Sequence, residues 1–146
     1  MIEESYDCFP FNNKTQFFFE STGLKGRVVK VVVFMRMEGN RWNVGFGDVR
    51  EGRVDDTSFT NNNDVRKVLS TVAKTIYQFS EIHPEKIIVI VPRDERRKHF
   101  YNAIFKRYFS IASEVFDIFG ILAEDRENYL PEKTYDSFEL LRKFEA

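Results

Sequence analysis

The residues best suited to chemistry in this sequence lie on one predicted helix, Glu95–Phe109, which reads ERRKHFYNAIFKRYF. At 100° per residue its large apolar side chains gather in one stripe, and Arg97 falls in that stripe one turn before Tyr101. The other members of the stripe are Phe100, Ile104, Phe105 and Tyr108. A guanidinium on a face that packs against a sheet needs acceptors, because an unpaired buried charge is strongly destabilising. An arginine beside a phenolic donor suits a carboxylate or another small anion.

The acid that we expect to meet Arg97 is Asp48, on a strand predicted over Arg41–Val49. Trp42, Val44 and Phe46 alternate along this strand, and a period of two turns Asp48 to the same inner side. Two interpretations remain open. Arg97, Tyr101 and Asp48 form either a structural network that ties the helix to the sheet or a site that binds an anion.

A second polar stretch, Asn61–Asn62–Asn63–Asp64, precedes a predicted helix and supplies the next candidate partners for Arg97, among them Asn62 and Asp64. Asn and Asp cap helices by accepting hydrogen bonds from the free backbone N–H groups of the first turn. A helix start also attracts phosphate. The stretch contains no glycine and Asp64 would repel an anion, so a plain cap is the favoured interpretation.

Basic residues are interleaved with aromatic ones near this helix, a mixture that nucleic-acid-binding proteins use. The cluster comprises Arg93, Arg96, Arg97, Lys98, Lys106 and Arg107. The aromatic residues follow the helical stripe, and Asp94 and Glu95 offset part of the charge, so a solvated face is favoured and nucleic acid is an unlikely partner.

No pattern indicates a nucleophile with its base or a metal site. Cys8 is the single cysteine, and the two histidines, His83 and His99, have no spacing typical of metal ligands. The acidic residues form no HExxH or DxD arrangement, so we expect no metal and no cofactor. Whether the protein is an enzyme stays open, with the balance against it.

Composition predicts one folded domain over residues 1–146 in a reducing, cytoplasmic compartment. Hydrophobic residues make up 42% of the chain and the net charge is −1, which is too apolar for disorder and too neutral for general attraction to nucleic acid. The acidic N-terminus lacks the apolar region of a signal peptide, and no segment approaches the ~18 apolar residues of a membrane span. We therefore expect no membrane association.

Periodicity predicts an α+β fold: a four-stranded antiparallel meander followed by α-β-α-β, with two helices packed on a mixed twisted sheet. On the longest strand the odd-numbered row, Val29 to Met37, is wholly apolar and is expected to face the helices, whereas the even row contains Lys30. The expected strands are Phe17–Glu20, Arg27–Met37, Arg41–Val49, Arg53–Thr60, Lys86–Val91 and Val115–Leu122, and the other expected helix is Asp64–Glu81.

Three further segments complete the chain. The N-terminal arm, residues 1–16, carries Tyr6, Phe9 and Phe11 around Pro10, and we expect these aromatic rings to pack over the core; the alternative is a partner-binding tail. Residues 124–134 form a charged loop. The spacing of apolar residues in Tyr135–Phe144 fits a strand or a short helix equally well.

Three stretches resemble a family of small uncharacterised bacterial proteins that is common in Bacteroidetes. They are GFGDVREGRVDD (Gly45–Asp56), TNNNDVRKVLSTVAKTIYQF (Thr60–Phe79) and RRKHFYNAI (Arg96–Ile104). Members share the GFGD, NN-x-D and R-x-x-x-Y motifs, although the family often has glycine where this chain has Asn63. The resemblance implies a common fold and marks Arg97 and Tyr101, but it implies no activity.

The order of elements is also similar to that of the GNAT acyltransferases. The glycine-rich acyl-CoA loop of that family would fall at Asn61–Lys67 and is absent, so the similarity concerns architecture only. We therefore expect a non-catalytic binding domain for a protein or a small anionic ligand, centred on Arg97, Tyr101 and Asp48. The alternative is a diverged acyltransferase with Tyr101 as general acid.

Overall fold

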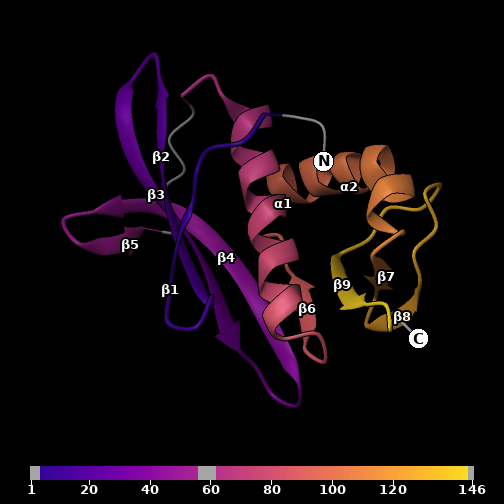
Figure 1. Ribbon diagram of the computed structural model, residues 1–146. Coiled ribbons are helices and arrows are strands. Elements are labelled where there is room, and N and C mark those ends of the chain that lie inside the picture. Colours follow the sequence, from indigo (N-terminus) through magenta and orange to yellow (C-terminus); the bar gives the residue numbers. More distant parts are fainter. Residues whose placement is uncertain (1–3, 56–61, 145–146) are drawn as a thin grey trace. The chain divides into compact units, whose positions relative to one another are not determined.

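The computed structural model describes residues 4–55 and 62–144, and these form two compact units (Figure 1). The first contains the described residues up to Met35 together with Val44–His83. The second contains Arg36–Asn43 together with the described residues from Pro84 onward. Within the described residues the fold is α+β, as predicted, with mostly antiparallel strands, two helices and one parallel strand pair, β4 with β6.

The first unit consists of a helix, the strands of the predicted meander and one further strand, β1, which lies in the segment predicted as an N-terminal arm. Its elements are β1 (Phe9–Phe11), β2 (Gln16–Gly23), β3 (Gly26–Arg36), β4 (Arg41–Arg50), β5 (Arg53–Asp55) and α1 (Val65–Ile82), with the ends of β3 and β4 nearest their shared turn belonging to the second unit. Strand β1 pairs with β2, β2 with β3, and β5 with β4, all antiparallel. Residues 56–60 of the predicted fourth strand lie outside the described residues.

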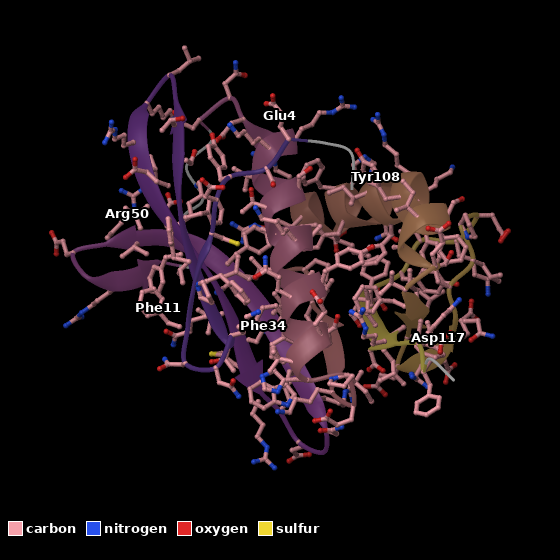
Figure 2. All side chains as sticks on the ribbon, in the orientation of Figure 1. Glu4, Phe11, Phe34, Arg50, Tyr108 and Asp117 are labelled. Atoms are coloured by element: carbon pink, nitrogen blue, oxygen red, sulfur yellow. The ribbon has the colours of Figure 1, made fainter. Side chains whose placement is uncertain are left out.

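The face of β3 that meets α1 is the even-numbered row, so the predicted assignment of the odd row to the helices is wrong. Phe34, which is labelled in Figure 2, stacks on Phe79 of α1 with ring centroids 4.1 Å apart. On the odd row, Val29 and Met35 are 41% and 58% exposed. Counting apolar residues favoured the odd row, of which Val31 is fully buried, but Val32 and Phe34 of the even row are buried too, and Lys30 can lie among them because it has a carboxylate partner.

Helix α1 buries the predicted apolar stripe. Val68, Val72, Ile76 and Phe79 are all buried, and so are Thr71 and Thr75 on an adjoining side. The N-terminal arm contacts that side, where the backbone N–H of Tyr6 donates to Thr71 Oγ1 over 2.8 Å. The predicted packing of the arm is therefore correct for Tyr6.

The second unit packs one helix on a mixed sheet. Its elements are the first residues of β4, then β6 (Ile87–Ile90), α2 (Glu95–Ala112), β7 (Phe116–Leu122), β8 (Asp125–Asn128) and β9 (Ser137–Arg142). Strand β9 lies between β6 and β7, and β8 is the outer neighbour of β7. Helix α2 covers one face through Phe105, whose ring stacks on Phe138 of β9 with centroids 4.1 Å apart.

Two segments of this unit resolve or correct the sequence predictions. The ambiguous segment Tyr135–Phe144 contains a strand, β9, and not a helix. The predicted charged loop, residues 124–134, contains strand β8, because Ala123 and Glu124 adopt positive φ angles of 51° and 70° and turn the chain back along β7.

Neither described helix combines the length and the apolar character that a bilayer crossing requires.

Candidate functional site

Asp48 points inward from β4 as predicted, and two cations of the first unit neutralise its carboxylate. Lys30 Nζ on β3 donates to Asp48 Oδ1 over 2.6 Å, and both side chains are almost fully buried, at 1% and 0% exposure. Arg50 Nη2 donates to the other oxygen, Oδ2, over 3.2 Å from a half-exposed position. This ion pair links two neighbouring strands of the sheet.

Arg97 and Tyr101 lie together on α2 in the second unit. The carboxylate of Asp94 caps the helix by accepting from the backbone N–H of Arg97 over 2.8 Å, and it lies 3.7 Å from the Arg97 guanidinium. The Arg97 side chain is 23% exposed. Burial raises the pKa of the Tyr101 hydroxyl to about 12, against the opposing effect of the Arg97 charge. Tyr101 is therefore a neutral hydrogen-bond donor at physiological pH.

The helical phase that placed Arg97 beside Tyr101 is reflected in the burial of α2. Arg97, Tyr101, Ile104 and Phe105 are all partly buried, whereas Phe100, which was assigned to the same stripe, is 38% exposed. Asp48 belongs to the first unit and Arg97 to the second. A direct pair between them stays a prediction.

Asn62 and Asp64 both tie the start of α1 to the hairpin of β2 and β3, Asp64 through Ser21 of β2 and Asn62 through Lys25 and Gly26. Tyr6 Oη and Ser21 Oγ each donate to Asp64 Oδ2 over 2.6 Å. Asn62 Nδ2 donates to the Gly26 carbonyl over 2.8 Å, and its Oδ1 accepts from the Lys25 N–H over 2.6 Å. These side chains act as a clamp between a helix and a hairpin.

The predicted side-chain cap at this helix start is therefore wrong. Asp64 occupies the capping position of α1, but its carboxylate makes no capping hydrogen bond, because Tyr6 and Ser21 engage it. Asn61, which was predicted to belong to the same cap, lies outside the described residues.

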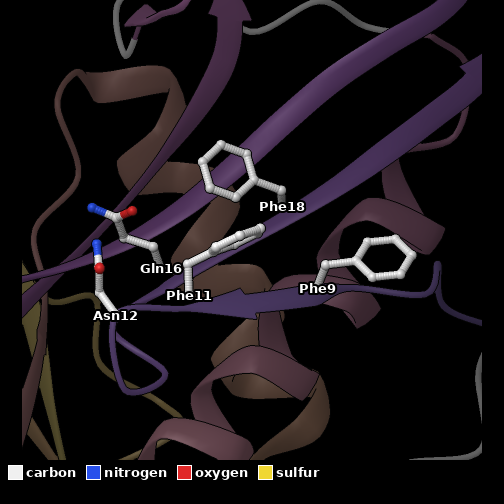
Figure 3. Close-up of a pocket in the computed structure, with 5 residues that line it drawn as sticks. All are labelled: Phe9, Phe11, Asn12, Gln16 and Phe18. Carbon is white, nitrogen blue, oxygen red and sulfur yellow. The ribbon is translucent and has the colours of Figure 1, made fainter.

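Sequence reasoning missed an open pocket on the first unit, on the sheet face that bears Phe18 (Figure 3). Phe9 and Phe18 are paired residues of β1 and β2, and so are Phe11 and Gln16; their side chains line the pocket together with Asn12. The rings of Phe11 and Phe18 meet edge to face, with centroids 5.3 Å apart and an 88° interplanar angle. Phe9 and Phe11 are 61% and 53% exposed. We call these five residues the aromatic pocket.

A turn of unusual backbone conformation borders the aromatic pocket. Asn12, Asn13 and Lys14 have φ angles of 50°, 55° and 59°, in the left-handed region that residues other than glycine rarely adopt. Two contacts hold the turn. Thr15 donates to the Asn12 carbonyl through its backbone N–H and its Oγ1, over 3.2 and 2.7 Å, and His83 Nε2 lies 3.0 Å from the Asn13 carbonyl oxygen.

The signal for the aromatic pocket was present in the sequence but admitted two interpretations. The arm was expected to pack its aromatic rings on the core, and Tyr6 does so at 9% exposure. Phe9 and Phe11 instead remain exposed because they alternate on a short edge strand whose outer face no described segment of this unit covers. The alternative of a tail that contacts a partner stays a prediction.

Within the described ranges, no group of three or more His, Cys, Asp or Glu side chains is arranged to hold a metal ion. Comparison with curated proteins and with solved structures found no match. A family model does match, over residues 2–143. With nearly its whole length matched, the chain belongs to DUF6934, a family of unknown function.

Proposed function

We propose that this chain is a non-catalytic binding domain that contacts another protein through the aromatic pocket. The observation that carries the proposal is the exposure of Phe9 and Phe11, at 61% and 53%, side by side on one strand. Phenylalanine is enriched at protein interfaces, and neighbouring exposed aromatic side chains mark interaction sites. The strained turn beside them adds support, because strained backbone tends to be retained where function requires it.

The chemistry of the pocket favours a protein over the other ligands. Its five residues carry no charge, in a chain where 31% of residues are charged. A small anion would find no cation there, and nucleic acid would find no positive charge to neutralise its phosphates. Side-chain amides of Asn12 and Gln16 can pair with the donors and acceptors of a peptide.

A second candidate site for a small anion is the pair Arg97 and Tyr101. The guanidinium is partly buried, and the Tyr101 hydroxyl keeps its proton because burial raises its pKa to about 12. A fixed cation beside a neutral donor would suit a carboxylate. Asp48, the third member of the predicted polar centre, would then have a structural role and stabilise the sheet by pairing with Lys30.

The alternative function is a diverged acyltransferase of GNAT-like architecture with Tyr101 as general acid. A general acid works best when its pKa lies near the operating pH, and a pKa of about 12 disfavours that role for Tyr101. A thermal-shift measurement with acetyl-CoA separates the two functions. A ligand that binds the folded state raises the melting temperature, so the binding-domain proposal expects no shift.

The direct test places a photo-crosslinking amino acid at position 11 or at position 24. Leu24 is the matched control, because it is 85% exposed and apolar on the same unit but lies outside the pocket. The protein crosslinked from position 11 is identified, purified and titrated against the wild type, Phe11→Ala and Leu24→Ala. We expect Phe11→Ala to weaken binding about tenfold or more, with Leu24→Ala unchanged.

Two results would overturn the proposal. One is crosslinking from both positions with equal yield, followed by equal affinities of the two variants. The other is crosslinking of position 11 only to a second copy of the chain, which would make the pocket a homodimer contact.

A further inference from the structure

We propose that the outward face of α2, in the second unit, binds single-stranded nucleic acid; this inference is independent of the aromatic pocket. The face is a row of exposed residues at helical spacing. They are Arg96, His99, Phe100, Ala103, Lys106 and Arg107, and we call them the basic stripe. Three of the six carry a positive charge at pH 7 and none carries a negative charge, although the net charge of the whole chain is −1.

The fold leaves the three cations of the basic stripe without a carboxylate partner. Within residues 4–55 and 62–144, the side chains of Arg96 and Lys106 make no hydrogen bond and no ion pair. The Arg107 guanidinium lies over the ring of Tyr108, 5.5 Å from its centroid, which leaves its charge unneutralised. All three charges therefore add to the positive potential at the surface of α2, where an anionic partner can reach them.

The acids that offset this cluster in the sequence act on other cations in the structure. Asp94 accepts a hydrogen bond from the backbone N–H of Arg97 over 2.8 Å and lies 3.7 Å from the Arg97 guanidinium. Lys98 Nζ donates to Asp136 Oδ1 over 2.7 Å, and Asp136 first and Glu95 as well raise the pKa of Lys98. These carboxylates neutralise the partly buried cations of α2, so the exposed stripe keeps an excess of positive charge.

The length of the basic stripe suits a partner with repeated negative charges. Arg96 and Arg107 are eleven residues apart on one helix, which places them ~16.5 Å apart along its axis. Successive phosphates of one nucleic-acid strand are separated by only a few ångströms, so such a row of cations can meet several of them. A ligand with a single carboxylate would engage one end of the stripe and leave the other end without a contact.

An exposed aromatic ring among the cations favours a single strand over the other polyanions. Phe100 lies one turn after Arg96 and is 38% exposed. Unpaired bases stack on such rings, and proteins that bind single strands combine stacking with a row of cations. The bases of a duplex are already stacked inside it, and an acidic peptide would gain charge pairing but no base stacking.

The interaction should act at short range and depend strongly on salt. Glu114 and Asp117, which follow α2, are exposed acids, so the second unit as a whole does not attract a strand from a distance. Charges separated by more than about 10 Å are largely screened at 0.1 M salt. The basic stripe therefore acts on a strand already in contact with it, and low salt is the condition in which binding is measured.

The test titrates the full chain with a fluorescein-labelled oligothymidylate of about twenty nucleotides, long enough to cover the stripe. Fluorescence anisotropy reports binding over a series of NaCl concentrations. The stripe variant is Arg96→Gln with Arg107→Gln. The matched control is Arg36→Gln with Lys143→Gln, which removes two exposed cations of the same unit outside α2. Phe100→Ser tests stacking, and circular dichroism checks that every variant is folded.

We expect the wild type and the control to bind alike, with a logarithmic salt slope of about −2 from three cations. The stripe variant should bind about tenfold more weakly at low salt, and its slope should fall to about −0.7. Phe100→Ser should weaken binding at least about fivefold with an unchanged slope, because it removes stacking and no charge.

Four results would overturn the inference. They are no binding by the wild type at low salt, an equal loss in the stripe variant and the control, equal displacement of the oligonucleotide by polyglutamate, and binding of a duplex as tight as that of the single strand. The third would assign the stripe to acidic proteins and the fourth to duplexes. The crosslinking test at position 11 concerns the aromatic pocket, so its outcome is separate from this one.

Discussion

A buried lysine and a buried aspartate join neighbouring strands of the first unit, and their pairing makes the stability of the protein sensitive to single charges. Lys30 and Asp48 are 1% and 0% exposed and 2.6 Å apart. Asp48→Asn should lower the free energy of unfolding by about 3–5 kcal/mol, because a buried cation then loses its carboxylate. Urea unfolding measures the change. Lys30→Met should cost less, because Asp48 keeps Arg50; the reverse order would contradict this account.

We predict that the protein loses stability at alkaline pH because the Tyr101 hydroxyl ionises more readily in the unfolded chain. Its pKa is about 12 in the folded protein, owing first to burial, and about 10 in an unfolded chain. The contribution of Tyr101 to the free energy of unfolding is therefore fully present below pH ~10 and is lost as the pH rises toward 12, because only the unfolded chain releases the proton readily in this range. Tyr101→Phe should flatten the fall of unfolding free energy between these pH values. Parallel curves for variant and wild type would exclude the effect.

At the scale of elements, strand β7 can contact the segment before β9 because Gly120 has no side chain. A Cβ at Gly120 would lie 2.3 Å from the ring of Tyr135, which is fully buried and cannot move aside. Gly120→Ala should therefore destabilise by about 1–3 kcal/mol, measured by thermal unfolding. Gly45→Ala is the control, because a Cβ added at Gly45 would meet nothing within 4 Å. Equal melting temperatures for the two variants would contradict the prediction.

Elements with a strong period were predicted from sequence, and elements that depend on a partner strand were not. Helix α1 and strand β3 match their predicted ranges within two residues. Strand β8 was missed because its charged sequence, DREN, has no strand pattern. Its Arg126 is nevertheless engaged across the sheet, donating from Nε to Glu139 Oε1 over 2.9 Å and lying 3.6 Å from the Phe119 ring centroid.

At the scale of the whole molecule, the near-neutral charge and the exposed aromatic rings should together govern self-association. The sequence pI is about 6.2, and molecules without net charge repel one another least. We expect the hydrodynamic radius from dynamic light scattering to rise most near pH 6.2. Replacing Phe9 and Phe11 with serine should suppress that rise, because exposed apolar patches drive non-specific association. An unchanged pH profile in the double variant would assign the association to another surface.

The sequence predicted which way single side chains of the candidate site point, but not which residues they contact. The inward direction of Asp48 and the partial burial of Arg97 follow from period two and period 3.6. Which cation meets Asp48 does not, because Lys30 lies 18 residues away on another strand. The clamp formed by Asp64 with Tyr6 and Ser21 likewise joins residues distant in sequence, which no local pattern encodes.

By itself the sequence determined the α+β class, most of the elements and the inward side of β4, because local periodicity and turn chemistry fix these before distant segments meet. Tertiary structure alone decided which row of β3 lies against α1, which cation neutralises Asp48, and that Phe9 and Phe11 remain exposed. The physical reason is that burial and ion pairing are properties of two surfaces in contact. A single chain segment carries the tendency to be buried, and its neighbours in space determine whether that tendency is met.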